Sequence, residues 1–340
     1  IHFAHQTFNW SNEAKSNAAV HVVIIGFAQF DSTNKRIFEY ENIKSNAHEK
    51  SAKNINAYLV EGDDIVIEKR RKPLCNVLNI IKGNYYAKSE GLIIEEKDLD
   101  YLVKNEPNAK KWIKLLIGAD EFINNRKRYC LWLVDCPPDE LRKMPLVMER
   151  VNRVREDRLK STDKGMQNLA PIRFRETNNP DKCIVIPVVS SEKRPYIPIG
   201  FIDKNTISTN GNLIIPNGDL FLFGQLTSLM QMSWVKYTCG RLESRFRYSK
   251  DIVYNNYPFP KNVSEKQKKA VEEKAQNVLD IRASFSDCSL ADLYDPLSMP
   301  PNLKKAHQEL DKAVDNCYGS KSFKNDKERI EFLFGLYEEY

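Results

Sequence analysis

The fold of this chain is organised around one stretch, Cys239-Gly240-Arg241-Leu242-Glu243-Ser244-Arg245-Phe246-Arg247-Tyr248-Ser249. Alternation along a strand would place Leu242, Ser244, Phe246 and Tyr248 on one face and Arg241, Glu243, Arg245 and Arg247 on the other. Neighbouring side chains on one face lie about 6.6 Å apart, because each residue of a strand rises about 3.3 Å. We therefore predict an extended strand that packs its apolar face on a core and holds a row of charged side chains outward.

Such a row suits contact with the edges of base pairs. Arginine can donate two hydrogen bonds to guanine in the major groove, and glutamate can accept one from the amino group of cytosine. A half-buried strand that shows a charged face to water produces the same pattern without any ligand. The residues of this stretch alone leave both interpretations open.

The composition is that of a globular protein of two or three domains. The chain has 340 residues and a formal net charge of +6, from 52 basic and 46 acidic residues, which permits a polyanionic partner without requiring one. No apolar run of about 18 residues occurs, so we expect no membrane span. The chain opens on Ile1 and runs at once into strand-like sequence, so we expect a fragment of a longer protein.

The seven cysteines are widely spaced and form no C-x-x-C pair, and the five histidines are scattered. Zinc sites need closer pairs of ligands than this. We therefore expect reduced thiols in a cytoplasmic protein and no metal site.

Apolar periodicity and turn residues predict the order of elements. Two strands are expected within 1–30, the second (18–27) buried on both faces, around a polar turn at 9–13. A polar connection should follow over 31–57, and loops with short strands over 58–91. The further expected elements are two helices within 95–117 divided at Pro107, a strand at 128–134, a basic helix at 139–161, strands at 183–186 and 197–202, a turn at 210–212, one helix over 219–238 ended by Gly240, and helices at 264–284, 303–317 and 326–340. The fold class expected is α+β, with a mixed domain of short sheets and helices followed by a C-terminal helical bundle.

Catalytic motifs are weak in this chain. It has neither a G-x-G-x-x-G motif nor a P-loop, so no nucleotide cradle is expected. Asp135-Cys136-Pro137-Pro138 is only a partial match to the tetrapeptide that positions an amine for methylation, since Asp139 stands where an aromatic residue would be needed. Glu95 and Lys97 offer half of a nuclease metal site, with Asp63 and Asp64 as upstream acids, but this pattern is common by chance in a chain rich in Lys and Glu. We expect no catalytic and no cofactor-binding residues here.

The helix at 139–161 carries four arginines within nine residues, Arg150, Arg153, Arg155 and Arg158. Arginine side chains match the geometry of phosphate oxygens, so this face is a candidate for contact with a nucleic-acid backbone. A solvated basic helix is the alternative.

Several strings, in order along nearly the whole chain, resemble the MmeI-like family of DNA adenine methyltransferases, many of which are single-chain restriction-and-modification enzymes. The matching strings are Phe3-Ala4-His5-Gln6-Thr7-Phe8-Asn9-Trp10-Ser11-Asn12-Glu13-Ala14, Ala19-Val20-His21-Val22-Val23-Ile24-Ile25-Gly26-Phe27, Arg128-Tyr129-Cys130-Leu131-Trp132-Leu133, Val189-Ser190-Ser191-Glu192-Lys193-Arg194, Tyr196-Ile197-Pro198-Ile199-Gly200-Phe201, Gly240-Arg241-Leu242, Arg247-Tyr248-Ser249, Tyr254-Asn255-Asn256-Tyr257-Pro258 and Ser289-Leu290-Ala291-Asp292-Leu293-Tyr294-Asp295-Pro296.

The resemblance implies a division into the last strands of a methyltransferase domain with a linker (1–45), a target-recognition domain (46–260) and a helical tail (261–340). It also implies double-stranded DNA as the partner and S-adenosylmethionine as the cofactor of the parent protein, which would methylate adenine at N6 and could carry a fused nuclease. The family's glycine motif and N-P-P-aromatic motif are absent from this chain, so the chain alone is expected to be inactive.

Family membership would also assign roles to single residues. The residues that match Glu243 and Arg245 vary together with one base of the target, and some relatives carry Lys and Asp there. The residue that matches Arg247, with one near Gly211, is tied to another base. Our candidates for phosphate contacts are Lys193, Arg194, Lys236, Arg241, Arg153, Arg155 and Arg158. A DNA-specificity protein without a catalyst and an interaction scaffold remain alternatives.

Overall fold

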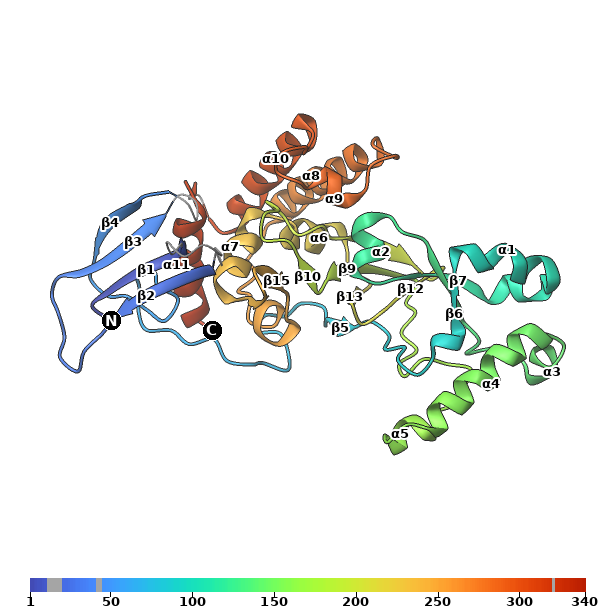
Figure 1. Ribbon diagram of the computed structural model, residues 1–340. Coiled ribbons are helices and arrows are strands. Elements are labelled where there is room, and N and C mark those ends of the chain that lie inside the picture. Colours follow the sequence, from blue (N-terminus) through green and yellow to red (C-terminus); the bar gives the residue numbers. More distant parts are fainter. Residues whose placement is uncertain (11–19, 41–44, 320–321) are drawn as a thin grey trace, which may run out of the picture.

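The computed structural model describes residues 1–10, 20–40, 45–319 and 322–340, which form an elongated molecule (Figure 1). The N-terminal strands, drawn in blue, lie at one end, and a lobe built from residues 86–174, in cyan and green, lies at the other. The C-terminal helices, in orange and red, cover the middle. The expected α+β class is confirmed.

The N-terminal sheet has the strand order β2-β1-β3-β4, with β1 antiparallel to β2 and parallel to β3. Its strands are β1 (Phe3–Trp10), β2 (Val20–Gly26), β3 (Lys35–Tyr40) and β4 (Ala47–Ala52). The two strands expected within 1–30 are confirmed, and part of the turn expected at 9–13 lies outside the described residues. The polar connection expected over 31–57 is wrong, because β3 and β4 pair there. Strand β3 buries Lys35 and Ile37 and strand β4 buries Ala52 alone, so neither has the run of apolar residues that would predict a strand.

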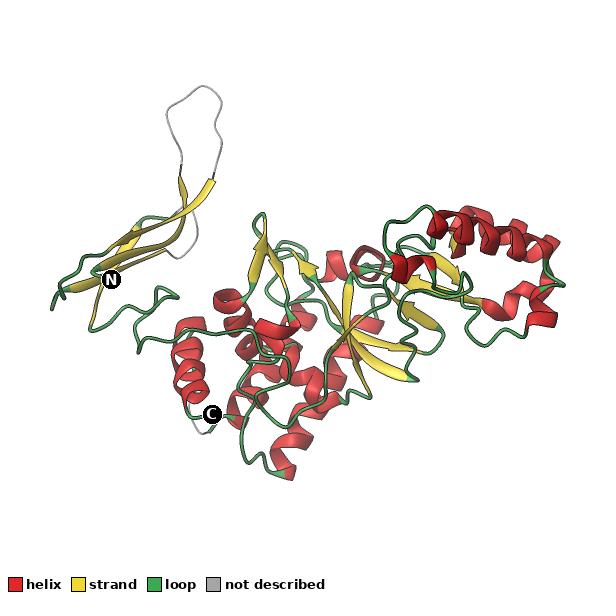
Figure 2. Ribbon diagram, turned by 90° about the horizontal axis from the view of Figure 1, so that it is seen from below, coloured by secondary structure: helices red, strands yellow, loops and turns green. Residues whose placement is uncertain are grey.

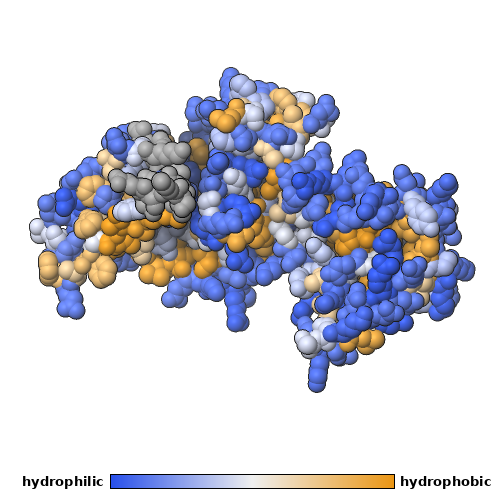
Figure 3. Space-filling view, viewed as in Figure 1, coloured by the Kyte–Doolittle hydropathy of each residue, from blue (hydrophilic) through white to orange (hydrophobic). Residues whose placement is uncertain are grey.

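Strand β2 contradicts the expectation of a strand buried on both faces. It forms an edge of the sheet, and Val20, Val23, Ile24 and Ile25 are exposed. Figure 3 shows an apolar area in orange over the N-terminal strands.

The distal lobe is a small sheet covered by helices, with the strand order β12-β7-β8-β6. Its elements are β6 (Ile93–Glu95), α1 (Glu96–Asn105), β7 (Ile113–Ile117), α2 (Ala119–Asn124), β8 (Arg128–Leu131), α3 (Pro138–Leu141), α4 (Pro145–Leu159), α5 (Lys164–Gln167) and β12 (Thr206–Ser208). The strand near 128–134 is confirmed. The single basic helix expected over 139–161 is confirmed only in part, because residues 142–144 divide the stretch into α3 and α4, and Pro145 begins the second helix. The second helix expected before residue 117 is wrong: a 3-10 turn over Pro107–Trp112 leads into β7, which pairs with β8 and β12.

The central lobe joins the sheet β11-β9-β13-β5 to two helices. Its elements are β5 (Ile81–Lys82), β9 (Lys182–Pro187), β11 (Gly200–Asp203), β13 (Asn212–Pro216), α6 (Leu220–Leu226) and α7 (Leu229–Thr238). The single helix expected over 219–238 is wrong. It breaks at Thr227, and the Ser228 side chain accepts a hydrogen bond from the Gln231 backbone, which caps a new helix. Gly240 is not a helix cap, because Cys239 after α7 is already extended.

The C-terminal helices are α8 (Glu265–Ala283), α9 (Leu290–Leu293), α10 (Pro301–Cys317) and α11 (Asp326–Glu338), and the three long helices confirm the prediction. They do not stand apart as a separate bundle. Buried side chains of α8, α10 and α11 form one hydrophobic cluster with those of α6, α7 and β9. In Figure 2 these helices, in red, form one group in the middle of the molecule.

Candidate nucleic-acid interface

The stretch that organises the sequence is a β-hairpin and not a single strand. Strand β14 (Gly240–Leu242) pairs antiparallel with β15 (Arg245–Arg247), and Leu242 lies opposite Arg245. A two-residue turn, Glu243-Ser244, joins them, and Glu243 has a φ of +57°. This left-handed conformation favours Gly or Asn. Neither residue occurs in this turn, so turn-forming residues do not predict a hairpin here.

The hairpin changes which side chains share a face. Residues that pair directly across an antiparallel ladder lie on the same side, so Arg241 lies with Phe246, while Arg245 and Arg247 lie on the other side. The Arg241 guanidinium packs 4.1 Å from the centre of the Phe246 ring and donates hydrogen bonds to the Lys236 and Ser244 carbonyl oxygens, each at 3.2 Å. The prediction that Arg241 belongs to the outward charged row is therefore wrong.

The base of the hairpin is anchored and its tip is free. Strand β10 (Val189–Ser190) pairs with β15, and Phe246 and Tyr248 are each only 2% exposed in the central core. The Tyr248 hydroxyl accepts a hydrogen bond from the Gln231 side chain of α7 at 2.9 Å. Charged side chains at the tip thus stand on a fixed support.

At the tip, Arg245 Nη2 lies 2.9 Å from Glu243 Oε2, with the two side chains 45% and 77% exposed. An ion pair between such exposed groups stabilises by only about 0–1 kcal/mol. A stronger partner can therefore separate Glu243 from Arg245 at little cost. Arg247 is also exposed, and its side chain has no hydrogen-bond or ion-pair partner among the residues that the structure describes.

The turn near Gly211 lies beside the base of the hairpin. Its carbonyl accepts a hydrogen bond from the Val188 backbone at 3.0 Å, and the Val188 carbonyl accepts one from Tyr248 at 2.8 Å. Val189 then pairs with Arg247. The structure therefore brings Gly211 and Arg247, which lie far apart in the sequence, to the two sides of one short strand.

The other basic candidates near the hairpin differ in their availability. Lys193 is exposed, while Arg194 is half-buried, and burial lowers the pKa of Arg194. Lys236 forms an ion pair with Asp326 of α11. Lys236 therefore already has a counter-ion within the molecule.

The arginines of α4 also separate into two kinds. Arg153 and Arg155 are exposed, and Arg153 lies 3.6 Å from Glu149. Arg158 is 1% exposed and donates five hydrogen bonds, to the carbonyl oxygens of Lys88, Leu169, Ala170 and Arg173 and to Ser89 Oγ. The prediction that Arg158 contacts phosphate is therefore wrong. It continues the buried stripe of Val147, Val151 and Val154, a spacing that already marked it as inward-facing.

One basic run escaped the sequence prediction. Lys69, Arg71 and Lys72 are exposed on a segment that runs along residues 251–256, where the Arg70 backbone donates to the Asp251 carbonyl at 2.9 Å. The Asn255 side chain donates to the Arg70 carbonyl at 2.7 Å. Four consecutive basic residues at 69–72 are the sequence feature that could have predicted this candidate contact.

The described residues hold no group of three or more His, Cys, Asp or Glu placed to bind a metal. Asp64 accepts a hydrogen bond from Asn54, whereas Glu95 pairs with Arg128 in the ladder of the distal lobe, so the two halves of the nuclease pattern lie in separate parts of the fold. The Asp135-Cys136-Pro137-Pro138 segment follows β8 in the same distal lobe. Among the residues that the structure describes, no helix is both long and apolar enough to cross a bilayer.

Known proteins and family models match this chain over nearly its whole length. Three family models match: the MmeI target recognition domain over residues 61–261, the MmeI C-terminal domain over 263–340 and the MmeI DNA-methyltransferase domain over 1–39. The chain is 39% identical to DNA methyltransferase A of Bacillus subtilis (strain 168) over 343 residues, which is 100% of this chain and 38% of that protein. A solved structure of the type IIL restriction-modification enzyme MmeI in complex with DNA is 44% identical, with a TM-score of 0.88, and the match covers 99% of this chain and 45% of that one.

Proposed function

This chain belongs to the MmeI family, and we propose that it is the part of a DNA methyltransferase that recognises a specific sequence of double-stranded DNA. The observation that carries the proposal is the hairpin 240–247, whose exposed Glu243 and Arg245 stand on a base fixed in the core. A rigid support with free charged tips is what hydrogen bonding to base edges requires.

The free energies involved favour replacement of the ion pair between Glu243 and Arg245 by contacts of these side chains with bases. The ion pair between Glu243 and Arg245 stabilises by about 0–1 kcal/mol. A well-placed bidentate pair with a base contributes about 1–3 kcal/mol of discrimination. Opening the ion pair on a duplex is therefore favourable when the matching base pair is present and not otherwise.

Arg247, with the turn at Gly211, would contact a second position. The exposed Lys193, Arg153 and Arg155 would contact phosphates and so fix the register of the protein on the duplex without selecting a sequence. Lys69, Arg71 and Lys72 are added to these candidates. Arg194 and Lys236 would contribute less, since one is half-buried and the other is paired with Asp326.

This chain spans 38% of the curated relative and 45% of the chain in the solved structure. The methyl-transfer step would belong to the rest of the parent protein. We propose adenine N6 as the target atom, S-adenosylmethionine as the methyl donor and a nuclease fused in the parent, as the resemblance to the family implies. This chain has neither a glycine-rich cradle nor an N-P-P-aromatic motif, so its residues do not fit the cofactor. On its own the chain would bind DNA and transfer no methyl group.

The test exchanges the two charges at the tip in the full-length protein, by Glu243→Lys together with Arg245→Asp. The exchange keeps an ion pair across the turn, so the hairpin should still fold. Mapping of methylated sites should then show a different base at one position of the target. An unchanged recognition sequence would refute the proposal.

A matched control is Lys193→Gln. Loss of a phosphate contact should weaken binding to all sequences alike and reduce the slope of log K against log salt by about 0.9.

A further inference from the structure

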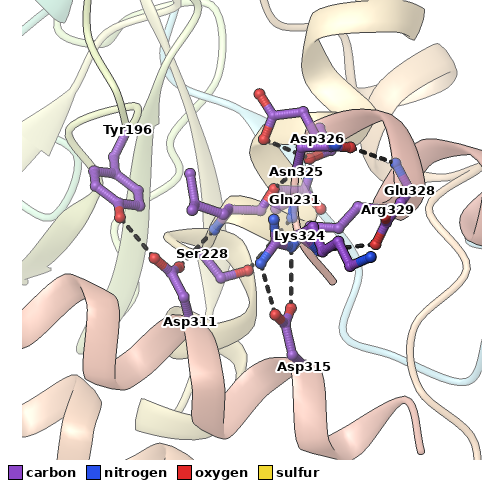
Figure 4. Close-up of polar contacts among 12 residues, drawn as sticks. Tyr196, Ser228, Gln231, Asp311, Asp315, Lys324, Asn325, Asp326, Glu328 and Arg329 are labelled. Carbon is purple, nitrogen blue, oxygen red and sulfur yellow. Dashed lines mark hydrogen bonds and ion pairs between the residues drawn. The ribbon is translucent and has the colours of Figure 1, made fainter. Parts of the chain in front are cut away.

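Helix α7 leads directly into the hairpin, because it ends at Thr238 and β14 begins at Gly240. The orientation of α7 therefore helps to set the position of the charged tip. Two carboxylates of the C-terminal helices, Asp311 and Asp326, contact α7, the first at its start and the second at Ser233 and Lys236 (Figure 4 labels both carboxylates).

At the start of α7, Asp311 of α10 makes the contact. Its Oδ1 accepts a hydrogen bond from the Leu229 backbone at 2.7 Å, and its Oδ2 accepts one from the Tyr196 hydroxyl, also at 2.7 Å. A carboxylate is favourable at this position, because the N-terminal end of a helix carries a partial positive charge. Asp311 is 4% exposed, so one buried group joins α10, α7 and the loop before β11.

Near the end of α7, Asp326 of α11 makes the second contact. Its Oδ1 accepts a hydrogen bond from Ser233 Oγ at 3.1 Å, and its Oδ2 forms the ion pair with Lys236. Ser233 and Lys236 are three residues apart and so are neighbours on one face of the helix. The C-terminal helices thus hold α7 at two points.

Helix α7 in turn holds the chain that leaves the hairpin. The Gln231 side chain donates to the Tyr248 hydroxyl at 2.9 Å, and Trp234 Nε1 donates to the Val253 carbonyl at 3.0 Å. The hairpin is therefore attached to α7 through both of its strands.

Polar contacts of this kind are an expensive way to join helices. A buried carboxylate loses its hydration and needs several partners in good geometry, whereas an apolar contact of the same size would hold the helices together at no such cost. Hydrogen bonds, however, fix distance and direction. Base reading needs side chains held within about 0.5 Å of the productive geometry.

We propose that Asp311 and Asp326 are positioning residues for DNA recognition, which hold α7 so that the tip of the hairpin meets the base edges in register. The C-terminal helices are then part of the specificity apparatus and not only a support for the fold. This inference rests on the proposed role of the hairpin in reading DNA.

The test uses the full-length protein with Asp311→Ala or Asp326→Asn. The quantity measured is the methylation rate at the recognition site divided by the rate at a site with one base changed. Each variant should lower this ratio by roughly threefold to tenfold, the size expected when one hydrogen bond that sets geometry is lost. Asp311→Asn should restore most of the ratio, since its amide oxygen can accept from Leu229 and its NH2 group can donate to the Tyr196 oxygen.

The matched control is Tyr294→Phe. It removes another buried hydrogen bond of the C-terminal helices, the 2.8 Å contact between the Tyr294 hydroxyl and His307 Nε2, which does not involve α7. Its melting temperature should fall while its ratio stays that of the unaltered protein. Asp326 and Lys236 are partly exposed, so Asp326→Asn should fold even if Asp311→Ala does not.

Hydrogen exchange of the amides of 240–247 supplies a readout without DNA. Exchange should be faster in Asp311→Ala and Asp326→Asn than in Tyr294→Phe. Equal exchange and equal ratios in all three would overturn the positioning role, and the base-reading proposal would still stand if the charge exchange at Glu243 and Arg245 altered the target. Both proposals would be overturned if hydrogen exchange at 240–247 were faster in the two Asp variants while swapping the charges at Glu243 and Arg245 left the methylated sequence unchanged.

Discussion

The guanidinium of Arg241 lies over the ring of Phe246, 4.1 Å from its centre, and the two residues face each other across the hairpin. The same guanidinium donates to the Lys236 carbonyl at the end of α7. Arg241 therefore ties the hairpin to the helix before it, although the sequence pattern assigned it to the outward charged row.

From this contact we expect Arg241→Met to destabilise the hairpin by about 0.5–1 kcal/mol, the usual size of a partly exposed cation–π contact. Hydrogen exchange at the amides of β14 would measure it. The salt dependence of DNA binding should not change. A decrease of the slope of log K against log salt by about 0.9 would instead identify Arg241 as a phosphate contact.

Arg158 and Arg155 should behave in opposite ways although they lie on one helix. Arg158→Met removes the hydrogen bonds that Arg158 donates to four carbonyl oxygens and to Ser89 Oγ, so we expect a loss of about 3 kcal/mol or more in the free energy of unfolding. Urea denaturation would measure the loss.

The comparison variant, Arg155→Met, removes an exposed side chain and should change stability by less than about 0.5 kcal/mol. It should reduce the salt slope of DNA binding if Arg155 meets a phosphate. Equal stability of the two variants would contradict the structural role of Arg158.

Arg158 and Glu243 are two residues whose structural roles could not be predicted from the sequence. Helices such as α8 and α10 follow from local periodicity and capping residues, and the strand pair of β1 and β2 follows from its apolar runs. The burial of Arg158 depends on carbonyls of residues 88, 169, 170 and 173, which only the tertiary fold brings together. The turn at Glu243 uses a left-handed residue without Gly or Asn, so turn statistics could not locate it.

The candidate site likewise has residues that the sequence predicted and a contact that only the fold shows. Glu243, Arg245 and Arg247 were singled out by alternation and by resemblance to a family, and all three are exposed at the hairpin. The contact of the Gly211 turn with that hairpin, through Val188, is a property of the sheet connections. The basic run at 69–72, in contrast, is visible in the sequence itself as four consecutive positive charges.

A pH effect should follow from Asp311. Burial raises the pKa of this carboxyl to about 7, above its ordinary value near 4. The folded state then binds the proton more tightly than the unfolded state, so the contribution of Asp311 to stability should fall as pH rises from about 4 to about 7. The difference in free energy of unfolding between the unaltered chain and Asp311→Asn, measured by urea denaturation at several pH values, should therefore decrease over this window.

His307 provides a control of opposite sign. Burial lowers its pKa to about 3, so the folded state binds the proton more weakly, and its contribution should be lost as pH falls from about 6.5 towards 3. Comparison of the unaltered chain with His307→Asn should show this loss on the acid side. A difference for Asp311→Asn that stays constant from pH 4 to pH 8 would contradict the raised pKa.

The core that α6 and α7 share with the C-terminal helices depends on a close approach at Gly224. A Cβ atom built on Gly224 of α6 would lie 2.6 Å from Val271 Cγ1 of α8, well inside van der Waals contact. Gly224→Ala should therefore force α6 and α8 apart and cost about 1–3 kcal/mol, as overpacked cores usually do. Gly335 of α11 has no atom within 4 Å of such a Cβ, so Gly335→Ala should stabilise the chain by up to about 1 kcal/mol through helix propensity. Thermal melts of the two variants should shift in opposite directions. A shift to higher temperature in both would mean that α6 and α8 do not meet at Gly224, and that the C-terminal helices do not share a core with the helix that precedes α7.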